Sequence, residues 1–351
     1  MSTTRSWVRP LVRSMRAYEA DVPPAAVKLD ANESPLDLPD EVKSEILAAI
    51  RSRASNRYPD PSATRLRELL AAHVGVGPEC IVVGNGSDEL LTCLALVFGA
   101  EQAVCLRPAF AMYSVISNSC GTEAAWVDLT DDFDLDVDAM LAAGERGARP
   151  VYVGYPNNPT GRLFSRERME CLVHGFPGPV VVDEAYHEFA GQSMLDMVGE
   201  CANLVVLRTF SKAFGLAGWR LGYMIAPPDV AAEVNKVRLP YNVNAMTQIA
   251  GCVCMERKAE LLPRLSEIIS QRDVVLSRMS DMDGLTVFPT DANFILFRTG
   301  LPAAQVFDGL LARGILVRNL DDGGRLAGCL RVTVSTEDEN AAFLAALSEV
   351  I

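Results

Sequence analysis

The stretch LVVLRTFSKAFGLAGWRLGYMIA, residues 204–226, decides the fold that we expect for this chain. It begins with the apolar run LVVL (204–207) and ends with LGYMIA (221–226). Short runs that are apolar throughout are typical of strands buried on both faces of a sheet. Between them lies a polar and aromatic segment with a single lysine, Lys212. We therefore expect two buried strands and a lysine at the end of the first.

Similar apolar runs occur upstream, and each is followed by a stretch of helical character. These runs are CIVV (80–83), AVCL (103–106), AAWV (124–127), PVYV (150–153) and PVVV (179–182). With the two runs above, they predict a mostly parallel, seven-stranded sheet that is covered by helices. The sequence thus predicts a large domain of the α/β class.

The pattern changes after Pro227, where apolar positions recur with helical spacing through 229–237, 245–256 and about 260–280. From residue 285 onward, strands and helices alternate on a shorter scale, which predicts a smaller α+β domain. Its elements are TVF (286–288), NFILF (293–297), a helix over 302–312, ILV (315–317), CLRVTV (329–334) and a helix from 337. We expect an N-terminal arm (1–40) that joins the small domain, a large domain (41–257) and a small C-terminal domain (258–351).

The composition restricts the possible functions. The 351 residues are 49% hydrophobic and carry a formal net charge of -13, so we expect a globular protein that does not bind nucleic acid or anionic lipid. No apolar stretch approaches the length needed to span a membrane. The nine cysteines form no C-x-x-C pair and the three histidines lack metal-ligand spacing, which predicts a reduced, cytoplasmic protein without a metal site. An anionic ligand would need a local cluster of arginine or backbone amides.

Lys212 is the first candidate for catalysis. A desolvated lysine loses part of its preference for the charged form and can attack an aldehyde. The segment TFSKAFGLAGWRLGY (209–223) resembles the cofactor-lysine signature of fold type I, class II aminotransferases, which depend on pyridoxal 5'-phosphate. The resemblance implies that Lys212 is catalytic and bonds covalently to the aldehyde of that cofactor.

Two further segments resemble the family at the cofactor ring. VVDEAY (181–186) implies that Asp183 pairs with the pyridinium nitrogen and that Tyr186 donates to the phenolic oxygen. PNNPTG (156–161) implies that Asn158 binds the same oxygen. A carboxylate at the ring nitrogen keeps it protonated, so the ring can accept electrons from the substrate α-carbon.

Two aromatic residues extend the resemblance. RPAFAMY (107–113) resembles the segment whose aromatic side chain stacks on the ring, here Phe110, although Phe110 as a simple core residue stays open. NRYPDP (56–61) resembles a motif whose tyrosine, here Tyr58, reaches the cofactor phosphate of the partner subunit. A homodimer is then required, whereas an exposed turn is the alternative reading of this motif.

The segment VVGNGSDELL (82–91) is the candidate phosphate site. It places a glycine turn after a strand and puts Ser87 and Asp88 at the start of a helix, where free amides and the helix dipole favour an anion. Glu89 stands at the third glycine of the dinucleotide fingerprint, so that fingerprint is absent. The resemblance adds three residues from the lysine segment to the phosphate site, namely Thr209, Ser211 and Arg220.

Substrate recognition is expected in the small domain and the arm. CLRVTVS (329–335) resembles the strand whose arginine, here Arg331, forms a fork with the substrate α-carboxylate. Four segments resemble the histidinol-phosphate aminotransferase family: VRPLVRSMRAY with Tyr18, KLDANESP with Asn32, RLPYNVN with Tyr241 and GILVRNL with Arg318. In that family the two tyrosines and the arginine surround the substrate phosphate, and the asparagine lies beside the substrate. Two arginines would suit a substrate with two anionic ends.

The resemblance implies transamination between L-histidinol phosphate and 2-oxoglutarate in histidine biosynthesis. Lys212, once displaced from the cofactor, would move the α-proton as general base and then acid. An aromatic or other biosynthetic aminotransferase, or an amino-acid-phosphate decarboxylase, would use the same scaffold. A non-catalytic regulator is less well supported, because no basic helix-turn-helix precedes residue 30.

Overall fold

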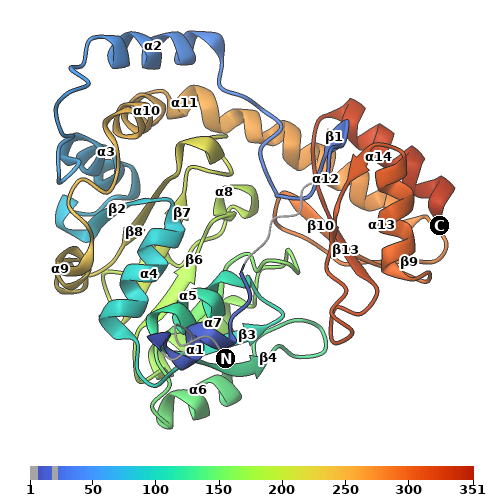
Figure 1. The fold of residues 1–351 in the computed structure, drawn as a ribbon, viewed down its shortest axis with the longest axis horizontal. Coiled ribbons are helices and arrows are strands. Elements are labelled where there is room, and N and C mark those ends of the chain that lie inside the picture. Colours follow the sequence, from blue (N-terminus) through green and yellow to red (C-terminus); the bar gives the residue numbers. More distant parts are fainter. Residues whose placement is uncertain (1–6, 18–22) are drawn as a thin grey trace.

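The computed structural model describes residues 7–17 and 23–351, and a seven-stranded sheet lies at its centre (Figure 1). The strands are arranged in the order β2-β8-β7-β6-β5-β3-β4, and β8 runs antiparallel to both of its neighbours. Their bounds are β2 (Ile81–Asn85), β3 (Gln102–Arg107), β4 (Glu123–Asp128), β5 (Val151–Gly154), β6 (Val180–Asp183), β7 (Leu204–Thr209) and β8 (Leu221–Ile225). The seven apolar runs of the sequence are these strands, so the predicted mostly parallel sheet is confirmed.

Helices cover both faces of this sheet, which explains why the strands are apolar throughout. Successive side chains of a strand point to opposite faces. In β6, Val181 packs in one buried cluster, and its neighbours Val180 and Val182 pack in another. The helices over the first cluster are α4 (Ser87–Phe98), α5 (Met112–Cys120) and α9 (Pro228–Val237). Those over the second are α3 (Thr64–Val74), α6 (Val137–Glu145), α7 (Arg166–Gly175) and α10 (Ala245–Glu256).

Shorter elements complete the large lobe. Helix α2 (Asp40–Arg51) packs on α10, and it presents Val42 and Ile46 to the core. The remaining elements are α8 (His187–Ala190) and the 3-10 turns η2 (Pro78–Cys80), η3 (Leu195–Met197) and η4 (Ala217–Trp219). Turn η4 lies directly before β8, so it connects the lysine segment to the antiparallel strand.

The small lobe contains an antiparallel sheet in the order β12-β13-β10-β9 and a two-stranded parallel pair, β1-β11. Its strands are β1 (Val27–Lys28), β9 (Leu285–Val287), β10 (Phe294–Thr299), β11 (Ile315–Leu316), β12 (Arg318–Asn319) and β13 (Cys329–Thr333). Its helices are α12 (Leu265–Ser280), α13 (Ala303–Ala312) and α14 (Glu337–Val350). The predicted smaller lobe of strands and helices is therefore present.

The structure differs from the sequence interpretation at two breaks. The helix expected over about 260–280 is divided into α11 (Lys258–Leu261), the turn η5 (Leu262–Arg264) and α12. Pro263 lies in that turn, and proline removes a helix hydrogen bond and clashes with the preceding turn. The expected strand ILV (315–317) ends one residue early, at Leu316, and a further strand follows, because the chain changes partner at Val317: β11 pairs with β1, and β12 pairs with β13.

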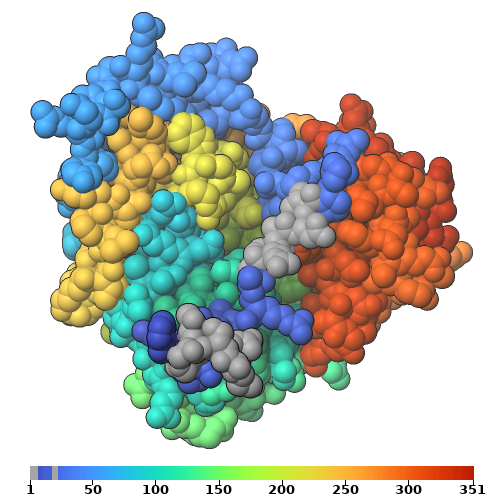
Figure 2. All heavy atoms as spheres, in the orientation of Figure 1, coloured from blue at the N-terminus to red at the C-terminus, as the bar shows by residue number. Residues whose placement is uncertain are grey.

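The N-terminal arm contacts both lobes. Helix α1 (Pro10–Ser14) packs on α5, whereas β1 pairs with β11 of the small lobe. In the space-filling view the small lobe (orange to red) stands beside the large lobe, and blue residues of the arm lie between the two (Figure 2). Within the described residues, no helix is both long and apolar enough to cross a membrane.

Candidate active site

A cavity of about 490 Å³ lies where the carboxyl ends of the large sheet face the small lobe. Ligands of open α/β sheets bind at this edge, because the loops after parallel strands meet there. Most of the residues singled out in the sequence line this one cavity. They are Asn32, Ser87, Asp88, Phe110, Asn158, Asp183, Tyr186, Thr209, Ser211, Lys212, Arg220, Arg318 and Arg331.

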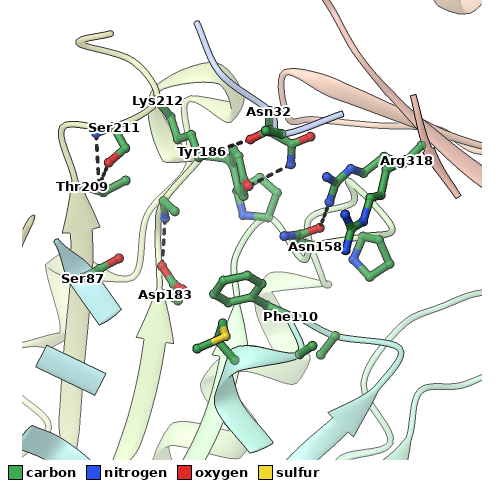
Figure 3. A pocket seen from close by; sticks show the side chains of 18 of the residues that line it. Asn32, Ser87, Phe110, Asn158, Asp183, Tyr186, Thr209, Ser211, Lys212 and Arg318 are labelled. Atoms are coloured by element: carbon green, nitrogen blue, oxygen red, sulfur yellow. Dashed lines mark hydrogen bonds between the residues drawn. The ribbon is translucent and has the colours of Figure 1, made fainter. Parts of the chain in front are cut away.

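Lys212 follows the end of β7 and points into the cavity (Figure 3). Its Nζ donates a hydrogen bond to the carbonyl oxygen of Ala31 at 3.0 Å. Burial, followed by the nearby charge of Arg331, lowers the pKa of Lys212 to about 8. A lysine with this pKa is partly neutral near physiological pH, so its amine can act as a nucleophile and can move protons.

Asp183 is the last residue of β6, and only 6% of it is exposed. Its Oδ1 accepts a hydrogen bond from the backbone N–H of Ala185 at 3.2 Å, and its Oδ2 accepts one from the hydroxyl of Tyr113 at 2.9 Å. Burial raises the pKa of the Asp183 carboxyl to about 6. A buried carboxylate is stabilised by a cationic partner, and a protonated ring nitrogen in the cavity would supply one.

Tyr186 and Asn32 form a hydrogen-bonded pair close to Lys212 (Figure 3). The Nδ2 of Asn32 donates to the Tyr186 hydroxyl at 2.9 Å, and the backbone N–H of Asn32 donates to Oγ1 of Thr333 at 2.9 Å. Burial raises the pKa of Tyr186, so the phenol keeps its proton. Because its oxygen accepts from Asn32, this proton is available for another acceptor in the cavity.

A polar corner of the cavity lies at the N-terminus of α4. Arg220 donates from Nη2 to Oδ2 of Asp88 at 3.2 Å and from Nη1 to Oγ of Ser211 at 3.5 Å, and Thr209 donates to the same Ser211 oxygen at 3.0 Å. Gly86 precedes the helix with a φ of 76°, and a Cβ at that position would lie 2.5 Å from Nη2 of Arg220. Free amides, a hydroxyl and a guanidinium converge there, which is the donor set of an anion site.

A second cationic corner lies in the small lobe, where Arg318 of β12 and Arg331 of β13 are direct cross-strand partners. Arg331 is fixed in place: its Nη1 donates to Oδ1 of Asn158 at 2.6 Å, and its Nη2 donates to the carbonyl oxygen of Asp30 at 2.7 Å. The two arginines therefore lie beside each other at one corner of the cavity and not at its opposite ends; Arg318 is labelled in Figure 3.

Comparison with known proteins agrees with this geometry. The family model Aminotransferase class I and II matches residues 24–347. The chain belongs to this aminotransferase family. It is 40% identical over 347 residues to a histidinol-phosphate aminotransferase of Thermoanaerobacter pseudethanolicus, and the aligned region covers 98% of each protein. It is 43% identical over 352 residues to histidinol-phosphate aminotransferase 2 of Cupriavidus pinatubonensis, and the aligned region covers 97% of this chain and 95% of the relative.

Solved structures extend the comparison. The histidinol-phosphate aminotransferase of Sinorhizobium meliloti, solved in complex with pyridoxal-5'-phosphate, superimposes with a TM-score of 0.87 at 26% sequence identity. The superposition covers 98% of this chain and 97% of that one. The resemblance predicted from sequence motifs is thereby confirmed over nearly the full length of this aminotransferase.

Two tyrosines predicted for the site lie outside the cavity in this aminotransferase chain. Tyr58 and Tyr241 are 76% and 40% exposed, and their rings stack with centroids 4.4 Å apart and an interplanar angle of 15°. Tyr241 adopts a left-handed φ of 61°. The roles assigned to both residues stay predictions, as does that of Tyr18, which lies outside the described residues.

Sequence reasoning missed several residues that line the aminotransferase cavity. Tyr113 donates a hydrogen bond to Asp183 and lies three residues after Phe110 in the quoted segment RPAFAMY. Its place in that segment could have indicated that it lies near the site. Phe110 itself lines the cavity and also packs against the core, with its ring edge-on to Tyr113. Lys28 and Leu320 likewise lie in the quoted segments KLDANESP and GILVRNL, whereas no quoted segment contains Asp322 or Leu326.

Proposed function

We propose that this aminotransferase uses pyridoxal 5'-phosphate to transfer the amino group of L-histidinol phosphate to 2-oxoglutarate, forming imidazole acetol phosphate and L-glutamate in histidine biosynthesis. The observation that carries the proposal is the convergence in one cavity of a buried lysine, a buried carboxylate and an anion corner at a helix N-terminus. The names of the two relatives above and the cofactor in the Sinorhizobium meliloti structure support it.

The residues present fit this cofactor. The amine of Lys212 would meet the aldehyde, and the carboxylate of Asp183 would face the ring nitrogen. The proton of Tyr186 and the Nδ2 of Asn158 would point to the phenolic oxygen. Phe110 would cover one face of the ring. The phosphate would be held by the amides of Ser87 and Asp88 at the start of α4, the hydroxyls of Thr209 and Ser211, and the guanidinium of Arg220.

When bound, the cofactor supplies an electron sink for the electron pair left at the substrate α-carbon. The chain's own part in the reaction is proton transfer and orientation. Lys212 takes the α-proton as a base and returns a proton as an acid, and its lowered pKa makes both directions accessible near neutral pH. Arg331, held by Asn158, fixes the anionic group of the substrate relative to Lys212.

The arrangement of the arginines suits the chemistry of both substrates. L-Histidinol phosphate carries a phosphorylated hydroxymethyl group where glutamate carries its α-carboxylate, so each substrate brings an anion to the same side of the α-carbon. Adjacent guanidiniums on β12 and β13 can receive either group. Arg331 would hold the carboxylate, and Arg318, with Tyr18 and Tyr241, would add the contacts that the larger, more highly charged phosphate needs.

A homodimer with shared active sites is part of the proposal. The stacked pair Tyr58 and Tyr241 supports this proposal, because both aromatic rings are exposed on the surface of the single chain. Contact with a second copy would cover them and bring Tyr58 to the cofactor phosphate of that copy. We also propose a cytoplasmic location, in keeping with nine cysteines that are all unpaired.

The test is to mix the purified protein and cofactor with L-histidinol phosphate and 2-oxoglutarate and to measure glutamate. Stoichiometric glutamate and imidazole acetol phosphate are expected. Release of carbon dioxide from an amino-acid phosphate would favour the decarboxylase. Turnover of aromatic amino acids with none of histidinol phosphate would favour an aromatic aminotransferase. Either of these results would overturn the proposed substrate.

A further inference from the structure

We propose that Tyr113 is a positioning residue for Asp183, and that its hydroxyl keeps this carboxylate ionised and turned toward the ring nitrogen of the cofactor. The inference rests on the proposed function only in taking pyridoxal 5'-phosphate as the cofactor. It assigns a role to a buried tyrosine that lies in the segment RPAFAMY but to which the family resemblance gave no role.

The first argument is the geometry of the carboxylate. Tyr113 lies in the first turn of α5 and is 3% exposed. Its hydroxyl donates to Oδ2 of Asp183 at 2.9 Å, while the backbone N–H of Ala185 donates to Oδ1 at 3.2 Å. With one donor on each oxygen, rotation of the carboxylate would break a hydrogen bond. These two donors give the Asp183 carboxylate one preferred orientation.

The second argument is the rigidity of the Tyr113 ring. It stacks on Tyr152 of β5 with centroids 5.5 Å apart and an interplanar angle of 8°, and it meets the edge of Phe110 at 5.5 Å and 86°. The backbone N–H of Tyr113 donates to the carbonyl oxygen of Phe110 at 3.1 Å. One tight turn thus presents both the ring of Phe110, which lines the cavity beside Asp183 (Figure 3), and the hydroxyl that holds the carboxylate.

The third argument is the charge around Asp183. Burial disfavours its ionised form most, and the nearby charges of Asp88 in α4 and of Glu184, which follows β6, act in the same direction. The neighbouring phenol of Tyr186 is neutral, because burial and the charge of Asp183 raise its pKa. The hydrogen bond from Tyr113 acts in the opposite direction and lowers the pKa of Asp183. Burial, and then the charge of Asp183, raises the pKa of Tyr113 well above its usual value, so the phenol keeps the proton that it donates.

This charge balance has a measurable consequence. A protonated Asp183 cannot pair with a pyridinium nitrogen, so cofactor affinity should fall as the pH drops through the pKa of Asp183, about 6 in the cofactor-free protein. Removing the Tyr113 hydroxyl takes away a hydrogen bond to the charged form only. The pKa should therefore rise, and the fall in affinity should begin at a higher pH.

The experiment measures the cofactor affinity of the cofactor-free protein across the pH range on both sides of about 6. In Tyr113→Phe, the midpoint should move upward by about one to about two pH units, the shift that corresponds to one charge-assisted hydrogen bond. Tyr152→Phe is the matched control: Tyr152 belongs to the same stacked pair and is equally buried, but its hydroxyl faces Ser117. Its midpoint should equal that of the wild type.

A second variant separates the possible failures. In Asp183→Asn the pH-dependent step should disappear, whether or not Tyr113→Phe folds, and its persistence would overturn the inference. A loss of affinity in Tyr113→Phe that is equal at every pH, or a midpoint shared with Tyr152→Phe, would also overturn it. A wild-type protein that does not bind the cofactor at all would instead refute the proposed function.

Discussion

Replacing Arg318 by alanine should impair the reaction of histidinol phosphate more than that of glutamate. Arg331 is anchored by hydrogen bonds to Asn158 and to the Asp30 carbonyl, so it should stay in place when its cross-strand partner is removed. The variant then loses one charge-assisted contact to the phosphate, worth about 1.5–3 kcal/mol. At about 1.4 kcal/mol per factor of ten, the expected loss in kcat/KM for histidinol phosphate is about tenfold to about a hundredfold.

The assay for Arg318 follows each half-reaction separately by single-turnover spectroscopy of the cofactor. Glutamate should lose less, because Arg331 alone can form a bidentate pair with its α-carboxylate. Arg313→Ala is the control for loss of a positive charge from the small lobe, since Arg313 pairs with Glu349 on the surface at 2.9 Å. Equal losses for histidinol phosphate, glutamate and unphosphorylated aromatic amino acids would show that Arg318 is structural.

Four other variants test separate parts of the site and fold. Lys212→Ala should abolish both turnover and the covalent fixation of the cofactor by borohydride, and fixation without the lysine would refute its role. In the wild type, the rate of covalent attachment should rise with pH through about 8, as the amine loses its proton. Tyr58→Phe should lower cofactor affinity in a protein that sediments as a dimer, whereas an active monomer with unchanged affinity would contradict the shared site. Gly86→Ala should weaken cofactor binding, measured by titration, because the added Cβ would lie 2.5 Å from a guanidinium nitrogen and φ is 76°. Glu184→Gln should lower the free energy of unfolding, measured in denaturant, by about 3–5 kcal/mol, since it leaves the buried Arg208 without its carboxylate. A change near zero would show that the attraction between Arg208 and Glu184 only balances the cost of burying both charges.

The sheet was predictable from sequence because its strands obey one simple rule. Each is enclosed by helices on both faces, so each appears as an uninterrupted apolar run. The breaks at Pro263 and Val317 were not predicted, and the reasons differ. The first break depends on a proline inside a helical pattern, and the effect of proline on a helix is local and can be inferred from the sequence. The second depends on which strands are available as partners, a property of the assembled lobe.

The site was predictable to the extent that its residues belong to motifs. Lys212, Asp183 and Asn158 follow strands in recognisable segments, and the cavity brings them together. The contacts between motifs were not predictable. Asn32 was expected beside the substrate, yet its amide donates to Tyr186, 154 residues away in the chain. Such long-range pairs depend on how the arm is laid across the large lobe, which no local pattern encodes.

Backbone conformation shows where tertiary contacts override local preference. Asn32, Arg220 and Tyr241 all have positive φ values, of 53°, 55° and 61°. For residues other than glycine this conformation costs about 1–3 kcal/mol each, so local sequence preference would not select it.

Tertiary contacts offset that cost at each position. Asn32 is held by Thr333 and Tyr186, and Tyr241 is stacked on Tyr58. Arg220 is held through its side chain by hydrogen bonds to Asp88 and Ser211 at the N-terminus of α4. These contacts all lie within the chain, so the fold itself contributes free energy that holds the polar side chains in place. Groups held in this way lose less conformational entropy on binding, which leaves more of a ligand's interaction energy for affinity and orientation.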